Sequence, residues 1–156
     1  MRIAYVISAT AALALTASAA PAATVEATNP PSVVSAMQSA GYQAKLVADK
    51  SGDPMIESGV AGKKFLVFFY NCTDNKDCRT IQFYTGFKPD KAVGLDRIND
   101  WNKHQRFGRA YIDSEGDPVI EMDVDLDDGG LSPALFTDNL EFWESAIAAF
   151  QKHIGL

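Results

Sequence analysis

Cysteine, histidine and positive charge are scarce in this sequence, and each scarcity excludes a class of function. The 156 residues include two cysteines, two histidines and 14 lysines and arginines against 20 acidic residues, for a net charge of −6. Nucleic acids and anionic membrane surfaces attract clustered lysine and arginine, so we expect neither as a partner. A zinc site needs four ligands, and only the two histidines could add nitrogen ligands to the two cysteines, so we expect no metal site.

Familiar catalytic patterns are also missing. The chain has no G-x-S-x-G, no glycine-rich phosphate loop and no H-E-x-x-H. A serine or cysteine nucleophile needs a neighbouring base. The only histidines, His104 and His153, fall near the ends of expected helices, where a histidine is commonly solvated. We therefore expect no enzyme, no catalytic residue and no cofactor.

The most hydrophobic stretch lies at the N-terminus and resembles a secretory signal peptide. Residues 1–19 combine Arg2, an apolar run and an Ala-Ser-Ala cleavage signal, with cleavage expected between about residues 19 and 23. The apolar run is shorter than the roughly 20 residues of a spanning helix. Cleavage removes only Arg2 from the charge count, leaving 13 basic against 20 acidic residues, a net charge of −7. We expect a flexible leader at 20–29, a single domain at 30–156, no membrane span after cleavage, and a periplasmic or secreted protein.

Hydrophobic periodicity predicts an α+β fold, with an antiparallel sheet and helices packed on it. Strands joined by hairpins, with helices between and after them, are typical of this class. The expected order is α-β-β-β-β-α-β-β-α. The elements are a helix from about 30 to 41, strands at 43–49, 55–62, 65–70 and 80–87, a helix from about 89 to 104, strands at 109–113 and 119–126, and a closing helix from 132.

Two of the expected strands differ in pattern. Residues 65–70 are apolar at every position, which predicts a central strand covered on both faces. Residues 119–126 alternate, so the even-numbered side chains should face the core while Glu121, Asp123 and Asp125 face solvent. Arg109, on the preceding strand, is placed to form a cross-strand pair with one of these acids.

The closing helix has the clearest amphipathic pattern in the chain. Ser132 is placed to cap it and Pro133 to occupy its first position. Its apolar residues recur at helical spacing and form a stripe wider than a coiled-coil seam. The stripe favours a helix lying on a sheet, although it would also suit a homodimer.

The two cysteines, Cys72 and Cys78, stand at the edges of a polar insert between two expected strands. In an exported chain, thiols meet an oxidising compartment and pair. A redox pair usually has the spacing C-x-x-C at a helix start, and a metal clip needs more ligands. We favour a structural disulfide and keep a reduced or redox-sensing pair and a metal clip as alternatives.

The acidic segment 121–128 suggests a second kind of function. Asp123, Asp125 and Asp127 alternate as do the first ligands of a calcium loop. The match fails later, because Asp128 stands where an EF-hand loop has glycine and Ala134 where it has glutamate. A strand with an acidic solvent face is the simpler interpretation. A calcium- or small-ligand-binding module remains the alternative function.

Trp101 and Asn102 lie in the segment INDWN, at the end of the second expected helix. Trp101 shares an apolar helix face with Ile98 and should pack on the sheet. Asparagine is a poor helix former, so Asn102 needs a reason to be there. It either bonds backbone where the helix meets the next strand or, with Trp101, contacts a ligand.

The segments INDWN, RFGRAYID, VIEMDVDL and GGLS, followed by the closing helix, resemble the core of the YbjN domain family of bacterial proteins. The resemblance covers roughly 32–150 and implies a fold similar to type III secretion chaperones. Family members are labelled sensory transduction regulators, and the family brings no catalytic residues. Chaperone-like folds use exposed sheet and helix grooves to bind other proteins or peptides. We therefore expect an unidentified protein or peptide partner, contacted through Trp101, Asn102, Arg109, Glu121, Asp123 and Asp125.

Overall fold

The computed structural model describes residues 24–60 and 62–156, so the expected signal peptide lies outside the described residues. The predicted order of elements is confirmed. It runs α1 (Pro30–Ser39), β1 (Gln43–Ala48), β2 (Pro54–Val60), β3 (Lys63–Tyr70), β4 (Thr80–Gly86), α2 (Leu95–His104), β5 (Arg109–Ile112), β6 (Pro118–Asp125) and α3 (Pro133–Ile154).

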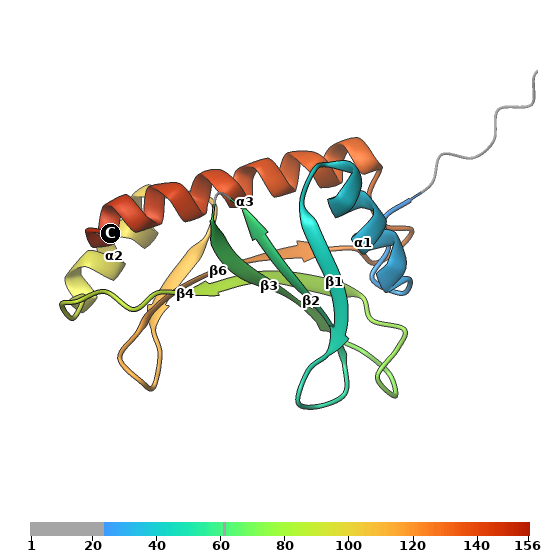
Figure 1. Ribbon diagram of the computed structural model, residues 1–156, viewed down its shortest axis with the longest axis horizontal. Coiled ribbons are helices and arrows are strands. Elements are labelled where there is room, and N and C mark those ends of the chain that lie inside the picture. The colour runs from blue at the N-terminus through green and yellow to red at the C-terminus, as the bar shows by residue number, and fades with distance from the viewer. Residues whose placement is uncertain (1–23, 61) are drawn as a thin grey trace, which may run out of the picture.

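The strands form one six-stranded antiparallel sheet in the order β1-β2-β3-β4-β6-β5. All three helices lie on the same side of this sheet, and only hairpin loops project on the other side (Figure 1). The fold class is therefore α+β, as predicted, and the likeness to type III secretion chaperones stays a prediction. No helix in the described part of the chain is both long and apolar enough to cross a bilayer.

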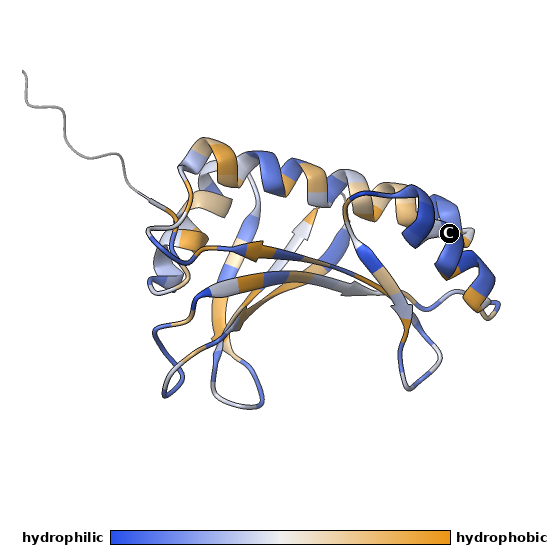
Figure 2. Ribbon diagram, turned by 180° about the vertical axis from the view of Figure 1, so that it is seen from behind, coloured by the Kyte–Doolittle hydropathy of each residue, from blue (hydrophilic) through white to orange (hydrophobic). Residues whose placement is uncertain are grey.

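The closing helix α3 covers the sheet, and its sequence explains why. Along its length hydrophobic and hydrophilic residues alternate in bands (Figure 2). Ser132 caps it by accepting a hydrogen bond from the Leu135 N–H at 3.2 Å, as predicted. The predicted apolar stripe is buried, whereas Leu135 and Phe142, which widen the stripe, are about half exposed. The buried residues of α3 include Phe136, Leu140, Trp143, Ile147, Phe150 and Ile154.

Aromatic rings form the centre of the core between α3 and the sheet. The Trp143 ring stacks on Phe83 of β4 with centroids 5.7 Å apart and meets Phe65 of β3 edge-on at 6.0 Å. All three side chains are buried. These strand residues reach α3 because successive strand side chains alternate between the two faces of the sheet.

The second helix starts later than predicted. The sequence suggested a start at Pro89 or Asp90, but α2 begins at Leu95, with Gly94 in extended conformation at its N-cap. Glycine inside a helix costs about 1 kcal/mol relative to alanine, yet it is accepted at an N-cap. The chain therefore uses Gly94 as the boundary.

Residues 24–29 are not a flexible leader, and this corrects the sequence analysis. Val25 exchanges two backbone hydrogen bonds with Leu131, at 2.8 and 3.0 Å, and both Val25 and Ala27 are buried. Gly130, next to Leu131, makes the close approach feasible. A Cβ at that position would lie 2.3 Å from the Val25 carbonyl oxygen.

The prediction that β3 is covered on both faces was also wrong. Phe65, Val67 and Phe69 point toward the helices and are buried, whereas Leu66 and Phe68 are partly exposed and Tyr70 is exposed. Because α1, α2 and α3 all lie on the other side, the second face of the sheet has no covering element among the described residues.

Candidate functional site

We call the face of the sheet opposite the helices the open face. The antiparallel registers place on it the side chains that alternate with the core residues of each strand. Four of the six residues predicted for a partner surface come together there. The open-face side chains discussed below are Leu66, Phe68, Tyr70, Gln82, Tyr84, Arg109, Tyr111, Glu121, Asp123 and Asp125.

An aromatic cluster occupies the middle of the open face. Phe68 of β3 meets Tyr84 of β4 edge-on, with ring centroids 5.6 Å apart, and lies 6.3 Å from Tyr70. Tyr70 is 45% exposed, while Phe68 and Tyr84 are half-buried. Half-exposed tyrosines offer a large rigid apolar area with a polar tip, which is the composition of protein-binding surfaces.

Hydrogen bonds link this cluster to the acidic strand β6. The Tyr70 hydroxyl donates to Gln82 Oε1 at 3.3 Å, and Gln82 Nε2 donates to Asp123 Oδ1 at 2.8 Å. Gln82 is buried although it lies on the open face, where side chains of both neighbouring strands, Tyr70 and Asp123, are bonded to it. The chain of bonds fixes the orientation of an exposed tyrosine.

An ion pair between exposed Arg109 and buried Glu121 stands beside the aromatic cluster. The Arg109 guanidinium bonds Glu121 Oε1, and the Tyr111 hydroxyl donates to Glu121 Oε2 at 3.4 Å. The predicted cross-strand pair of Arg109 is thereby confirmed. Glu121 is only 5% exposed, which corrects the expectation that it faces solvent. The carboxylate points away from the helices as the alternation predicts, but it lies in register between Tyr84 and Arg109 and is bonded by Tyr111.

Trp101 and Asn102 do not belong to the open face. The Trp101 ring lies edge-on to Phe150 of α3 with centroids 5.0 Å apart, and its Nε1 donates to the Gly108 carbonyl at 2.7 Å. Asn102 Nδ2 donates to the Ala110 carbonyl, and Asn102 Oδ1 accepts from the Ala110 N–H, both at 2.9 Å. Asn102 thus bonds backbone where α2 meets β5, the first of the two roles considered for it.

The sequence analysis missed Phe68, Tyr70, Gln82, Tyr84 and Tyr111. A signal for some of them was present, because 80–87 alternates and places Gln82 and Tyr84 opposite the core residues Ile81 and Phe83. The continuous apolar run of β3 concealed Phe68 and Tyr70. Such a run gives no indication of which face is left uncovered.

The acidic segment 121–128 does not converge on a metal site. Asp123 is bonded to Gln82, Asp125 Oδ1 accepts from the Asp127 N–H at 3.0 Å, and Asp127 pairs with Arg79 at 3.0 Å. Hydrogen bonds from the Arg79 side chain and the Asp128 backbone hold the pKa of Asp127 below its usual value. Within 24–60 and 62–156, no group of three or more His, Cys, Asp or Glu side chains could hold a metal ion.

Cys72 and Cys78 form the predicted disulfide across the tip of the β3–β4 hairpin. Cys78 is buried, and the loop between the cysteines is held against the neighbouring β1–β2 turn. Asn75 Nδ2 donates to the Ser51 carbonyl at 3.0 Å and to Asp53 Oδ1 at 2.9 Å. An intramolecular disulfide is typical of proteins in an oxidising compartment outside the cytoplasm.

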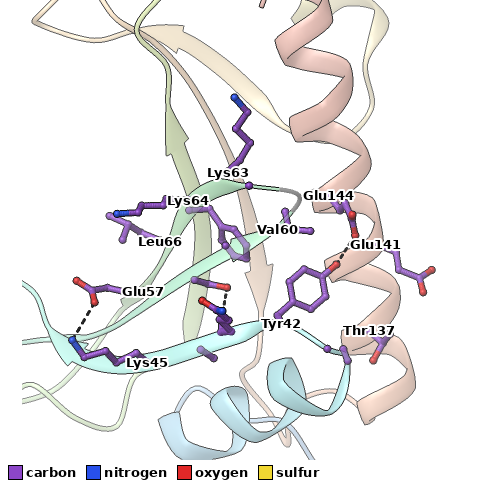
Figure 3. A pocket seen from close by; sticks show the side chains of 18 residues that line it. Tyr42, Lys45, Glu57, Val60, Lys63, Lys64, Leu66, Thr137, Glu141 and Glu144 are labelled. Carbon is purple, nitrogen blue, oxygen red and sulfur yellow. Dashed lines mark hydrogen bonds and ion pairs between the residues drawn. The ribbon is translucent and has the colours of Figure 1, made fainter.

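A groove of about 1010 Å³ opens between the β1–β2 hairpin and α3. At its inner side the Tyr42 hydroxyl donates to Glu144 Oε2 at 2.8 Å, which ties the start of β1 to α3 (Figure 3). Burial and the bond to Glu144 raise the pKa of Tyr42. The charged groups at the groove have mixed signs, with Lys63 and Lys64 opposite Glu141 and Glu144.

The tyrosines of the open face should have pKa values above that of free tyrosine. Burial, together with Glu121, raises the pKa of Tyr111 from 10.0 to about 12, and burial followed by Glu121 and Asp123 raises that of Tyr70. Because the folded chain holds the Tyr111 proton more tightly than the unfolded chain, this contribution to stability is complete below pH 10 and is lost as the pH rises toward 12. We expect the thermal unfolding midpoint to fall over this range, and to fall less in Tyr111→Phe. If the unfolding midpoint fell equally steeply with pH in the wild type and in Tyr111→Phe, the prediction would be contradicted.

Comparison with known proteins bears on the family to which this chain belongs. No curated protein and no solved structure gave a match to this chain. A family model does match, over residues 30–156, and its description is "Putative bacterial sensory transduction regulator". This match spans every helix and strand described above. The chain is therefore a member of the YbjN family.

Proposed function

We propose that this chain is a non-enzymatic, exported domain that binds a protein or peptide partner in the bacterial cell envelope through the open face. The observation that carries the proposal is the uncovered aromatic cluster of Phe68, Tyr70 and Tyr84. Tyrosine is enriched among the residues that dominate binding energy at protein interfaces. A sheet face that served only as an outer surface would not need three aromatic rings beside an ion pair with a buried carboxylate.

The arrangement of polar groups also favours binding over catalysis. On the open face, Gln82 is bonded to Asp123 and Arg109 to Glu121, and the two pairs hold a fixed pattern of charge beside the rings. Both histidines lie elsewhere, where His104 bonds the Asp100 carbonyl and His153 the Arg97 carbonyl. Their ring nitrogens therefore bond backbone carbonyls of α2.

Export is supported by two independent features of the chain. One is the signal-like sequence of residues 1–19, and the other is the Cys72–Cys78 disulfide. Expression of the full chain followed by fractionation should yield a periplasmic or secreted protein whose first residue lies between about 20 and 24, as read by N-terminal sequencing. An uncleaved protein in the cytoplasm would contradict this part of the proposal.

The binding proposal is tested by placing a photo-crosslinking phenylalanine analogue on either side of the molecule. The full chain carries the analogue at Tyr70, on the open face, or at Ser145, an exposed position of α3. Irradiation of living cells should give a discrete adduct from position 70 that is absent from position 145. Equal labelling from both sides, or none from position 70, would contradict the proposal.

The partner identified in this way is then purified and its affinity measured by calorimetry. Tyr70→Ala should weaken binding at least about tenfold, equivalent to ~1.4 kcal/mol, because an exposed tyrosine at the centre of an interface is a typical hot spot. Ser145→Ala is the matched control and should bind as the wild type does. Circular dichroism of both variants checks that the fold is retained.

A further inference from the structure

The two edge strands of the sheet, β1 and β5, differ in how their outward backbone groups are hydrogen-bonded. At the β5 edge, the Asn102 side chain bonds both the N–H and the carbonyl of Ala110, as a neighbouring strand would. At the β1 edge, among the described residues, the outward backbone groups receive a single bond, from Gln38 Nε2 to the Ala44 carbonyl at 3.2 Å. An edge strand with unpaired backbone groups is a template for another strand.

The register of the β1–β2 hairpin identifies the groups that point outward. The Asp49 N–H donates to the Asp53 carbonyl at 2.9 Å, just beyond the paired ends Ala48 and Pro54. In an antiparallel ladder, hydrogen-bonded and non-hydrogen-bonded pairs alternate. The odd-numbered residues of β1 therefore bond to β2, whereas Ala44, Leu46 and Ala48 direct their N–H and carbonyl groups outward. The bond from Gln38 to Ala44 agrees with this assignment.

On the helix-side face of β1, two alanines lie symmetrically about Leu46. Ala44 and Ala48 lie two residues away on either side of it, so small side chains flank a large one on the same face of the strand. Leu46 is 41% exposed, although it points to the face on which the helices pack. On the open face, Lys45 is already paired with Glu57 of β2 at 3.4 Å (Figure 3).

We propose that β1 pairs with β1 of a second copy of this chain, antiparallel, with the two-fold axis at Leu46. This register places Leu46 opposite itself, Ala44 opposite Ala48, and Lys45 opposite Val47 of the second copy. The exposed leucine is thereby covered, and no two like charges stand directly opposite each other. A two-fold interface must be self-complementary, and the sequence of β1 meets this requirement.

This dimer joins the two sheets into one and leaves both open faces uncovered. The Gln38 amide competes with the second copy for the Ala44 carbonyl. It gives up that bond when the Ala48 N–H of the second copy donates to the same oxygen. Among the described residues, the N–H and carbonyl of Leu46 and the N–H of Ala44 have no bond to give up before they pair with the second copy. The interface is separate from the binding surface of the proposed function.

The test uses the fact that a residue on a two-fold axis faces its own copy. We compare the purified mature wild-type protein, Leu46→Lys, Leu46→Glu and an equimolar mixture of the two variants by sedimentation velocity over a range of concentrations. The wild type should dimerise. Each variant alone should dimerise at least about tenfold more weakly, because like charges then meet at the axis. The mixture should recover a heterodimer.

Lys45→Glu is the matched control, because residue 45 faces Val47 and not itself. Its effect should be smaller than that of either Leu46 variant. A monomeric wild type at all concentrations, unchanged dimerisation of Leu46→Lys, or a mixture without heterodimer would each overturn the proposal. Photo-crosslinking from Tyr70 should be the same in Leu46→Lys as in the wild type, so the failure of one proposal is distinguished from the failure of the other.

Discussion

Replacing Trp143 with alanine should destabilise the domain by about 3–5 kcal/mol, the cost typical of removing a large buried aromatic side chain. Trp143 is fully buried and contacts Phe83 and Phe65, so its loss leaves a cavity where α3 meets two central strands. Urea unfolding followed by far-UV circular dichroism measures the change without depending on tryptophan fluorescence. The midpoint should shift strongly toward lower urea.

Trp143→Phe is the matched control. Trp143 Nε1 is buried without a hydrogen-bond partner among the described residues. An unsatisfied buried donor costs about 1–3 kcal/mol, and phenylalanine removes it while keeping a ring against Phe83. We expect the free energy of unfolding of this variant to fall by less than about 1.5 kcal/mol. Exchanges of one hydrophobic side chain for another of similar shape usually cost no more than this. Equal losses for the two variants would show that the ring contacts contribute little.

The Cys72→Ala/Cys78→Ala double variant should lose about 2 kcal/mol of stability, the chain-entropy value for so short a loop. Alanine is chosen because Cys78 is buried, where serine would add an unpaired hydroxyl. The crosslink also holds a backbone whose conformation is unfavourable for most residues. Asn71, Asp74, Asn75 and Asp77 all have left-handed backbone conformations, with φ between 51° and 60°. Asparagine and aspartate tolerate this region better than other residues with a Cβ, but at some cost.

The measurement is chemical unfolding of the wild type and the double variant, each with and without reductant. Reductant should lower the stability of the wild type to about that of the double variant and leave the double variant unchanged. Asn75→Ala, with the disulfide intact, separates the contacts to Ser51 and Asp53 from the crosslink itself. If reductant has no effect on the wild type, the disulfide does not stabilise the fold.

Local patterns in the sequence predicted most of the fold. The stripe on α3 repeats at helical spacing and is bounded by Ser132 and Gly155, so both the helix and its buried face could be predicted. The start of α2 could not. Pro89 is a favourable first residue, and only the extended conformation of Gly94 shows where the helix begins. The same limitation applies to Val25, because its partner Leu131 lies more than 100 residues away in the sequence.

The candidate site was predicted only in part, for a related reason. The alternation of β6 gave the correct direction of Glu121, but its burial depends on Arg109 and Tyr84, which come from neighbouring strands. Whether Phe68 is covered depends on the side of the sheet on which α3 lies, and that is decided some 65–85 residues later in the chain. Periodicity reports the direction of a side chain along its own strand and contains no information about the layer above it.

Because α3 follows all six strands in the sequence, it also determines when this protein can fold. The helix face of the sheet, with Phe65 and Phe83, stays without its cover until the last 22-residue helix has been synthesised. Contacts between such distant segments form late and slowly. If the chain is exported as proposed, it would still lack this cover while its N-terminal segment crosses the membrane. Folding would then be completed on the far side, together with formation of the Cys72–Cys78 disulfide.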